Sequence, residues 1–284
     1  MFGRRQDGRR LKLSDPIVGL TPYIMPRRDD SQVMVTQYID CDTLTAFIRA
    51  QRDAGNQISY MDLIIAAYVR TVAKYPELNR FIMNKKLYAR NHIAVSLAVL
   101  KSMEGDTIQE TTIKVKLPPE ATLMDVHNLF AASIEENRKP VTSNLTDKVA
   151  RTLLGTPGLA TFIVALARFL DRYGIMPGLI LKASPFHTSM FITNMASIGM
   201  PSVYHHIYNF GTTSVFIGMG RIERHAEPAP GGAVHFRRMI PLGVVIDERI
   251  ACGAAYGRAF SYLRELLADP AKLLVPPEKV NAEI

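Results

Sequence analysis

The sequence predicts an α/β fold in which helices flank a mixed β-sheet. Segments with alternating apolar residues are interleaved with segments of helical periodicity, but the two types do not alternate strictly, as they would in a parallel doubly wound sheet. The chain has 284 residues, of which 48% are hydrophobic and 21% charged. Such a composition is ordinary for a globular protein with a sizeable core. We therefore expect one α/β domain around a mixed sheet.

The first third of the chain predicts a strand followed by two helices. Within residues 31–55, alternating apolar positions give way to helical spacing, with Asp42 as the expected N-cap. The second helix begins at a capping-box-like pair, Ser59 and Asp62, and ends before Pro76. Because this helix is apolar on most of its faces, we expect it to be buried on several sides.

The remaining elements are mostly strands. In the segment 106–117, Ile113, Val115 and Leu117 alternate with polar residues, which predicts a sheet with one solvated face. Other expected strands lie within 86–101, 188–195, 212–223 and 233–248, and expected helices lie within 122–138 and after residue 252.

The apolar stretch at about 145–184 allows two interpretations. It is either a helical hairpin packed on the domain or on a neighbouring subunit, or a membrane-surface helix or lid over a hydrophobic acyl site. Its longest apolar run has 15 residues, "LLGTPGLATFIVALA", which is short of the roughly 20 that span a bilayer.

The net charge of +8 raises the question of nucleic-acid binding. Lysine and arginine are spread along the chain, and only the first 12 residues form a dense basic patch. This argues against nucleic acid and favours attraction of a small anionic ligand, such as a nucleotide-bearing cofactor. Cys41 and Cys252 cannot form a disulfide framework, and the N-terminus has no apolar signal segment, so we expect a soluble cytoplasmic protein.

Five segments in order resemble the catalytic domain of 2-oxoacid dehydrogenase acyltransferases, which share a fold with chloramphenicol acetyltransferase. They are "PYIMPRRDDSQVMVTQYIDCDTLTAFI", "YPELNRFI", "SMFITNMASIG", "TTSVFIGMGRIE" and the final strand–helix unit that begins with "VVIDERIACGAA". The resemblance divides the chain into a basic N-terminal arm (1–14), an acyltransferase-like domain (15–270) with the insertion at about 145–184, and a C-terminal tail (271–284).

The resemblance implies a coenzyme A-dependent acyltransferase that forms homotrimers with active sites between subunits, and it leaves open whether the trimers form larger assemblies. The family motif is His-x-x-x-Asp-Gly. Here Glu248 stands at the histidine position, Cys252 at the aspartate position, and Gly253 is retained. Thr193 stands at the place of the serine that stabilises the oxyanion. A lipoyl group carried by this chain and a metal site are not expected.

Glutamate is a poorer base than histidine for this chemistry. Its unperturbed pKa near 4.3 lies further below that of a thiol, about 8.5, than the histidine value of about 6.5. Burial raises catalytic carboxylates toward about 6 or 7, so Glu248 is either such a base or a surface residue in an ion pair. Asp247 and Arg249 point to the opposite face of the strand.

Other residues offer replacement chemistry. Cys252 is an acyl-accepting nucleophile if the following helix lowers its pKa, and otherwise an inert thiol. His187 and the pair His205–His206 are either replacement bases or structural histidines, and only one of the adjacent pair can enter a given site.

The sequence thus predicts acyl transfer between coenzyme A and a small acceptor, with Glu248, Thr193, Cys252 and His187 as candidate catalytic residues. The alternative is a catalytically silent trimeric scaffold of the same fold.

Overall fold

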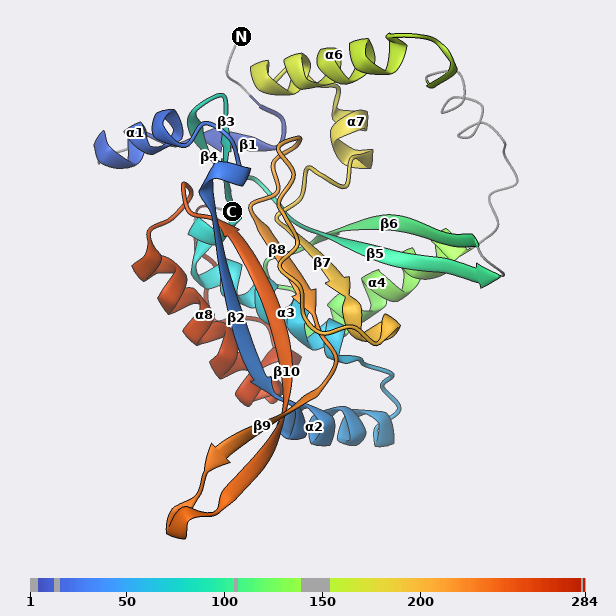
Figure 1. Cartoon of the computed structure of the whole chain (residues 1–284), viewed down its shortest axis with the longest axis vertical. Helices are drawn as coiled ribbons and strands as arrows, with labels where there is room; N and C mark the ends of the chain where they lie inside the picture. The colour runs from blue at the N-terminus through green and yellow to red at the C-terminus, as the bar shows by residue number, and fades with distance from the viewer. Residues whose placement is uncertain (1–4, 13–15, 105–106, 139–153, 282, 284) are drawn as a thin grey trace.

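The computed structural model describes residues 5–12, 16–104, 107–138, 154–281 and 283 (Figure 1). A mixed sheet of seven strands forms the centre of this part of the chain, in the order β2-β10-β8-β7-β5-β6, with β9 paired to β10. Strand β7 runs parallel to β5 and β8, and the other pairs are antiparallel. The strands are β2 (Gln32–Asp40), β5 (Ile93–Glu104), β6 (Thr107–Leu117), β7 (Met190–Asn194), β8 (Val215–Met219), β9 (Glu223–Pro228) and β10 (Val234–Asp247). The predicted mixed sheet is confirmed.

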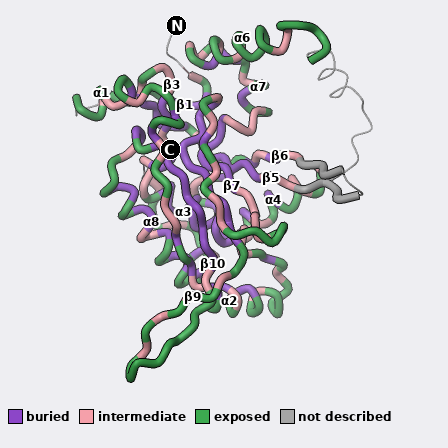
Figure 2. Tube along the Cα trace, in the orientation of Figure 1, coloured by how far each residue is buried: buried purple, intermediate pink, exposed green. Residues whose placement is uncertain are grey.

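Helices cover one face of this sheet. They are α2 (Cys41–Asp53), α3 (Tyr60–Lys74), α4 (Leu123–Arg138) and α8 (Gly253–Ala268). Twelve of the residues of α3 are buried, in agreement with the apolar faces seen in the sequence. Figure 2 shows the buried residues concentrated along the central strands and α3. In β6, Ile113, Val115 and Leu117 face the main core as the alternation predicts.

Two local predictions about helix starts had different outcomes. Ser59 and Asp62 form the predicted capping box of α3, with both reciprocal hydrogen bonds present. Asp42 is not the N-cap of α2, since the Asp40 carboxylate accepts hydrogen bonds from the backbone N–H groups of Asp42 and Thr43. The helix therefore follows β2 without a loop, and the cap lies two residues earlier than expected.

A small second sheet joins the N-terminal segment of the chain to the domain. Its order is β1 (Gly8–Arg10), β4 (Lys86–Arg90) and β3 (Arg80–Met83). Residues 5–12 of the expected N-terminal arm (1–14) are thus part of the fold, while 1–4 and 13–14 lie outside the described residues. In the C-terminal tail, the Asn281 backbone N–H donates to the Ala73 carbonyl.

The insertion places helices on the outside of the domain (Figures 1 and 2). Helix α6 (Leu159–Tyr173) has only Asp171 buried, and its Phe162 is 63% exposed. The short α7 (Gly178–Ala183) follows, and α1 (Pro16–Ile24) also has exposed apolar residues. The apolar stripe of α6 does not pack on the domain, and packing on a neighbouring subunit, a membrane-surface role and a lid stay predictions. Residues 145–153 lie outside the described part. No described helix is long and apolar enough to cross a membrane.

Candidate active site

A pocket of about 630 Å³ lies beside the carboxyl end of β7. One wall comes from α3 and α4, another from β5 and β6, and the last from η3 (Met195–Ile198) and the segment that follows it. Its walls are largely apolar, and polar groups contribute at a few positions, among them Thr193, Asn194, Ser197 and His205. A pocket of this size and character suits a small molecule.

Thr193 is half-buried near the end of β7. Its hydroxyl makes one contact in the described part of the chain, to the Sδ of Met195 at 3.9 Å. Because sulfur is a weak acceptor, the hydroxyl remains available to donate a hydrogen bond to a ligand in the pocket.

His205 lines the same pocket, while His206 is exposed. The Nδ1 of His205 lies 2.9 Å from the carbonyl oxygen of His206, which can only accept, so Nδ1 carries the proton and Nε2 carries the lone pair. The imidazole stacks on Phe216 with ring centroids 4.2 Å apart. Burial lowers the pKa of His205 below its ordinary value, which favours the neutral form.

Strand β10 ends at the buried Asp247, and the exposed Glu248 is the first residue of the turn that follows. Asp247 is fully buried, and its carboxylate accepts from the Arg249 guanidinium at 2.7 and 2.8 Å and from the Ser31 hydroxyl at 3.0 Å. Arg28 lies 3.6 Å from the same carboxylate. Glu248 is exposed, with its backbone N–H donating to the Ser31 carbonyl. The cluster fixes the turn, and Glu248 points outward.

Strand register keeps Glu248 away from Thr193 within one chain. Thr193 pairs with Gly218, which in turn pairs with Gly243 in the antiparallel β10. Glu248 follows Gly243 by five residues, which at about 3.3 Å per residue is about 17 Å along the strand. A site containing both groups therefore needs a second copy of the chain, and the role of Glu248 stays a prediction.

Cys252 is the N-cap residue of α8 and is exposed, whereas Cys41 is buried. Its side chain makes no capping hydrogen bond. A thiol at a helix N-terminus is where the sequence hypothesis placed it, and its nucleophilic role remains a prediction.

His187 belongs to a different, buried cluster. Its Nε2 lies 3.1 Å from Asp171 Oδ2, and its Nδ1 lies 2.8 Å from the Ser184 hydroxyl. Arg5 bridges Asp171 and Asp7, with an N–O distance of 2.8 Å to each carboxylate. Although burial alone raises the pKa of Asp171, hydrogen bonding and charge from His187 and Arg5 lower it overall. His187 thus anchors α6 to the domain and does not line the Thr193 pocket.

No group of three His, Cys, Asp or Glu side chains within metal-binding reach occurs among the described residues.

Comparisons with known proteins bear on this geometry. A sequence model of the family "2-oxoacid dehydrogenases acyltransferase (catalytic domain)" matches residues 28–103. The chain superposes on the cubic core of the pyruvate dehydrogenase multienzyme complex with a TM-score of 0.53 and 18% identity, covering 92% of this chain and 89% of the other. The chain has the acyltransferase catalytic-core fold.

Two further structures show the same fold. A probable dihydrolipoamide acetyltransferase from Listeria monocytogenes gives a TM-score of 0.54 at 14% identity, with 91% of this chain and 94% of that chain covered. A chloramphenicol acetyltransferase gives 0.54 at 11% identity, with 92% and 99% covered. No curated protein sequence matches the chain. The resemblance seen in the sequence is confirmed, and so is the acyltransferase fold.

Sequence reasoning missed two features of this acyltransferase-like domain. The buried pairing of Asp247 with Arg28 joins residues far apart in the chain, and no local pattern signals it. The sequence hypothesis weighed the His205–His206 pair only as replacement bases or structural histidines, and it did not place His205 in the pocket that Thr193 lines, because His205 lies in an irregular segment.

Proposed function

We propose that the chain transfers an acyl group between coenzyme A and a small acceptor in the pocket that Thr193 and His205 share. The observation that carries this proposal is the presence there of a free hydroxyl donor and a neutral imidazole with an available Nε2. Acyl transfer needs a base for the acceptor and a donor for the oxyanion. Both groups come from one chain.

The steps follow from these two groups. The Nε2 of His205 takes the proton from an acceptor thiol or hydroxyl, whose sulfur or oxygen attacks the thioester carbonyl carbon. The Thr193 hydroxyl donates a hydrogen bond to the resulting oxyanion. The carbon–sulfur bond then breaks, and the coenzyme A thiolate receives the proton from His205. The apolar walls, including Phe130 and Phe191, suit an acyl chain.

Glu248 is the second candidate base. Because it lies at the other end of the strands, it acts on this pocket only if the chain forms the trimer that the family resemblance implies. We propose that trimer as the working assembly in the cytoplasm, to be checked by light scattering, with larger assemblies as a further prediction. A particle mass of one chain, 31.7 kDa, would remove Glu248 from consideration.

The test measures coenzyme A release from acetyl-coenzyme A against a panel of thiols and alcohols. We expect His205→Gln and Thr193→Val each to lower kcat/KM by about 10²-fold or more. His235→Gln is the matched control, since His235 is exposed on β10 and does not line the pocket, and it should leave the rate close to that of the parent.

Other outcomes point elsewhere. If Glu248→Gln abolishes turnover while His205→Gln retains it, the base is Glu248 from a neighbouring chain. If calorimetry finds no binding of coenzyme A or acetyl-coenzyme A at millimolar concentration, the acyltransferase proposal fails.

The second candidate function is a catalytically silent trimeric scaffold. The observation that favours it is the exposed Glu248 at the position of the family's histidine, together with the apolar surface of α1 and α6. A trimer that binds no coenzyme A would support it.

A further inference from the structure

A second pocket, of about 520 Å³, lies near the end of β10, opposite to the end of β7 that carries Thr193. Segments far apart in the sequence form its walls: the loop before β2, the β3–β4 turn, the last turn of α6, the loop at 209–211 and the residue after Glu248. One carboxylate, from Asp171, faces six cationic side chains in it, those of Arg27, Arg28, Lys85, Arg168, Arg172 and Arg249.

Three of these cations have acidic partners outside the pocket. Arg27 pairs with Asp29, while Arg28 and Arg249 share the single carboxylate of Asp247. The last two guanidinium groups are almost fully buried, being 4% and 3% exposed. Burial lowers the pKa of Arg28 to about 10 although Asp247 raises it, and Arg249 lowers it further. Two buried cations on one anion leave positive charge uncompensated in a region of low dielectric.

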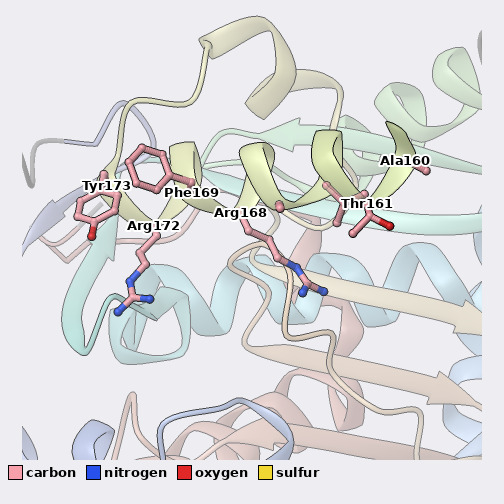
Figure 3. Close-up of a pocket in the computed structure, with 8 residues that line it drawn as sticks. Ala160, Thr161, Arg168, Phe169, Arg172 and Tyr173 are labelled. Atoms are coloured by element: carbon pink, nitrogen blue, oxygen red, sulfur yellow. The ribbon is translucent and has the colours of Figure 1, made fainter. Parts of the chain in front are cut away.

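The other three cations have no carboxylate partner in the described part of the chain. Arg172 donates to the neutral Asn84 Oδ1 at 3.1 Å, and the Lys85 ammonium lies 4.6 Å from the Tyr23 ring centroid. Arg168 has neither a hydrogen bond nor an ion pair among the described residues. Figure 3 shows Arg168 and Arg172 projecting from α6 on the same side, toward the body of the domain.

The β3–β4 turn holds its residues in an unusual conformation. Asn84 and Lys85 have φ values of 49° and 59°. Asparagine tolerates this left-handed region, but lysine rarely adopts it. Backbone strain of this kind persists where the surrounding structure fixes it and is common at ligand-binding sites. Here it places Lys85 on the pocket wall that faces Arg168 and Arg172.

We propose that this pocket binds a small molecule through a phosphate or pyrophosphate group, at a site separate from the acyl pocket. Guanidinium groups present two parallel N–H donors that match phosphate oxygens. A pyrophosphate carries enough negative charge to neutralise the three cations without carboxylate partners. The last turn of α6 supplies two of them, so the anchoring of α6 through Asp171 and His187 assembles the site.

The experiment is calorimetric titration of the full chain with pyrophosphate, repeated with orthophosphate and citrate. We expect pyrophosphate to bind, and Arg168→Gln and Lys85→Gln each to weaken it about tenfold or more, as loss of a charge-assisted hydrogen bond does. Arg258→Gln is the matched control: it removes the same charge from an exposed position on α8 and should change the affinity little.

Each contrary result overturns the proposal. Equal weakening by Arg168→Gln and Arg258→Gln would show attraction to the net charge alone. Stronger binding of citrate than of pyrophosphate would assign the pocket to carboxylates. Displacement of pyrophosphate by coenzyme A would make it part of the coenzyme A site, whereas independent binding supports a separate site. Acyl transfer by the same variants, measured in parallel, keeps this test distinct from that of Thr193 and His205.

Discussion

Asp247 and Glu248 are neighbours in sequence, but they have opposite environments because β10 ends at Asp247 and Glu248 begins the exposed turn that follows. Asp247 lies between two guanidinium groups in the interior, and Glu248 faces outward. Removing the charge of a buried partner such as Asp247 therefore disturbs the fold, and removing that of Glu248 does not. Substitution of Glu248 therefore tests whether the residue at the family's histidine position acts as a base, without disturbing the fold.

The pH dependence of acyl transfer distinguishes the two candidate bases. Burial lowers the pKa of His205, so the neutral, active form persists below its ordinary value of about 6.5. We expect kcat/KM to be level near neutral pH and to fall as pH drops through the lowered pKa. The measurement is a pH–rate profile from pH 4 to 8.

Two variants show which residue causes the fall of kcat/KM at low pH. Glu248→Gln should keep it, and the residual rate of His205→Gln should lack it. A fall that vanishes in Glu248→Gln and persists in His205→Gln would contradict the assignment to His205.

Residue identity alone predicted part of this site. The segment around Thr193 is a regular strand, so its position followed from a motif and a period of two. His205 lies in an irregular segment where no periodicity fixes the facing of a side chain. For the same reason the choice between His205 and His206 stayed open until the backbone path was known.

At the scale of elements, two glycines in the sheet allow the segment that carries His205 to lie against it. A Cβ at Gly243 would stand 2.3 Å from the Val203 carbonyl oxygen, and one at Gly218 would stand 2.7 Å from the same atom. Both contacts are with backbone, which cannot move as a flexible side chain does. The pocket wall thus depends on residues without side chains in β8 and β10.

Gly243→Ala is expected to push this segment off the sheet. We expect a loss of about 2 kcal/mol or more in the free energy of unfolding, as overpacking does, together with loss of the pocket. The control is Gly257→Ala in α8, where a Cβ meets nothing within 4 Å; it should stabilise by about 0.5–1 kcal/mol through helix propensity. Urea unfolding and coenzyme A titration of both variants give the answer, and equal stability of the two would contradict the role of Gly243.

For α6, the sequence predicted the helix but not which surface, if any, covers its apolar side. Its apolar periodicity correctly predicted a helix, because the spacing of residues such as Phe162 and Leu166 is a local property. The same pattern implied burial, but which surface covers a stripe depends on partners outside the chain segment. The residue that holds α6 on the domain is the buried Asp171, which pairs with Arg5 and His187. Helical periodicity alone predicts that a charged residue such as Asp171 faces solvent.

At the scale of the whole molecule, three ionisable groups, Asp7, His92 and Lys114, have pKa values that folding lowers. Burial lowers the pKa of His92 to about 3, with help from Arg90 and Lys116, and lowers that of Lys114 to about 7. The pKa of Asp7 is also lowered, by Arg5 despite burial. In each case the unfolded chain binds more protons than the folded one, so stability rises with pH.

We expect the urea midpoint to rise from pH 5 to 7 and again from pH 7 to 9, at fixed protein concentration. The first rise reflects His92, whose folded pKa of about 3 lies below its ordinary 6.5, and the second reflects Lys114, between about 7 and 10.5. Above pH 10 the raised pKa of buried Tyr68 reverses the trend, so the test stops at 9. Lys114→Met should flatten the second rise and leave the first. A midpoint that stays level between pH 7 and 9 in the parent chain would mean that Lys114 remains charged in the folded state, held by the Leu181 and Ser184 carbonyls to which it donates.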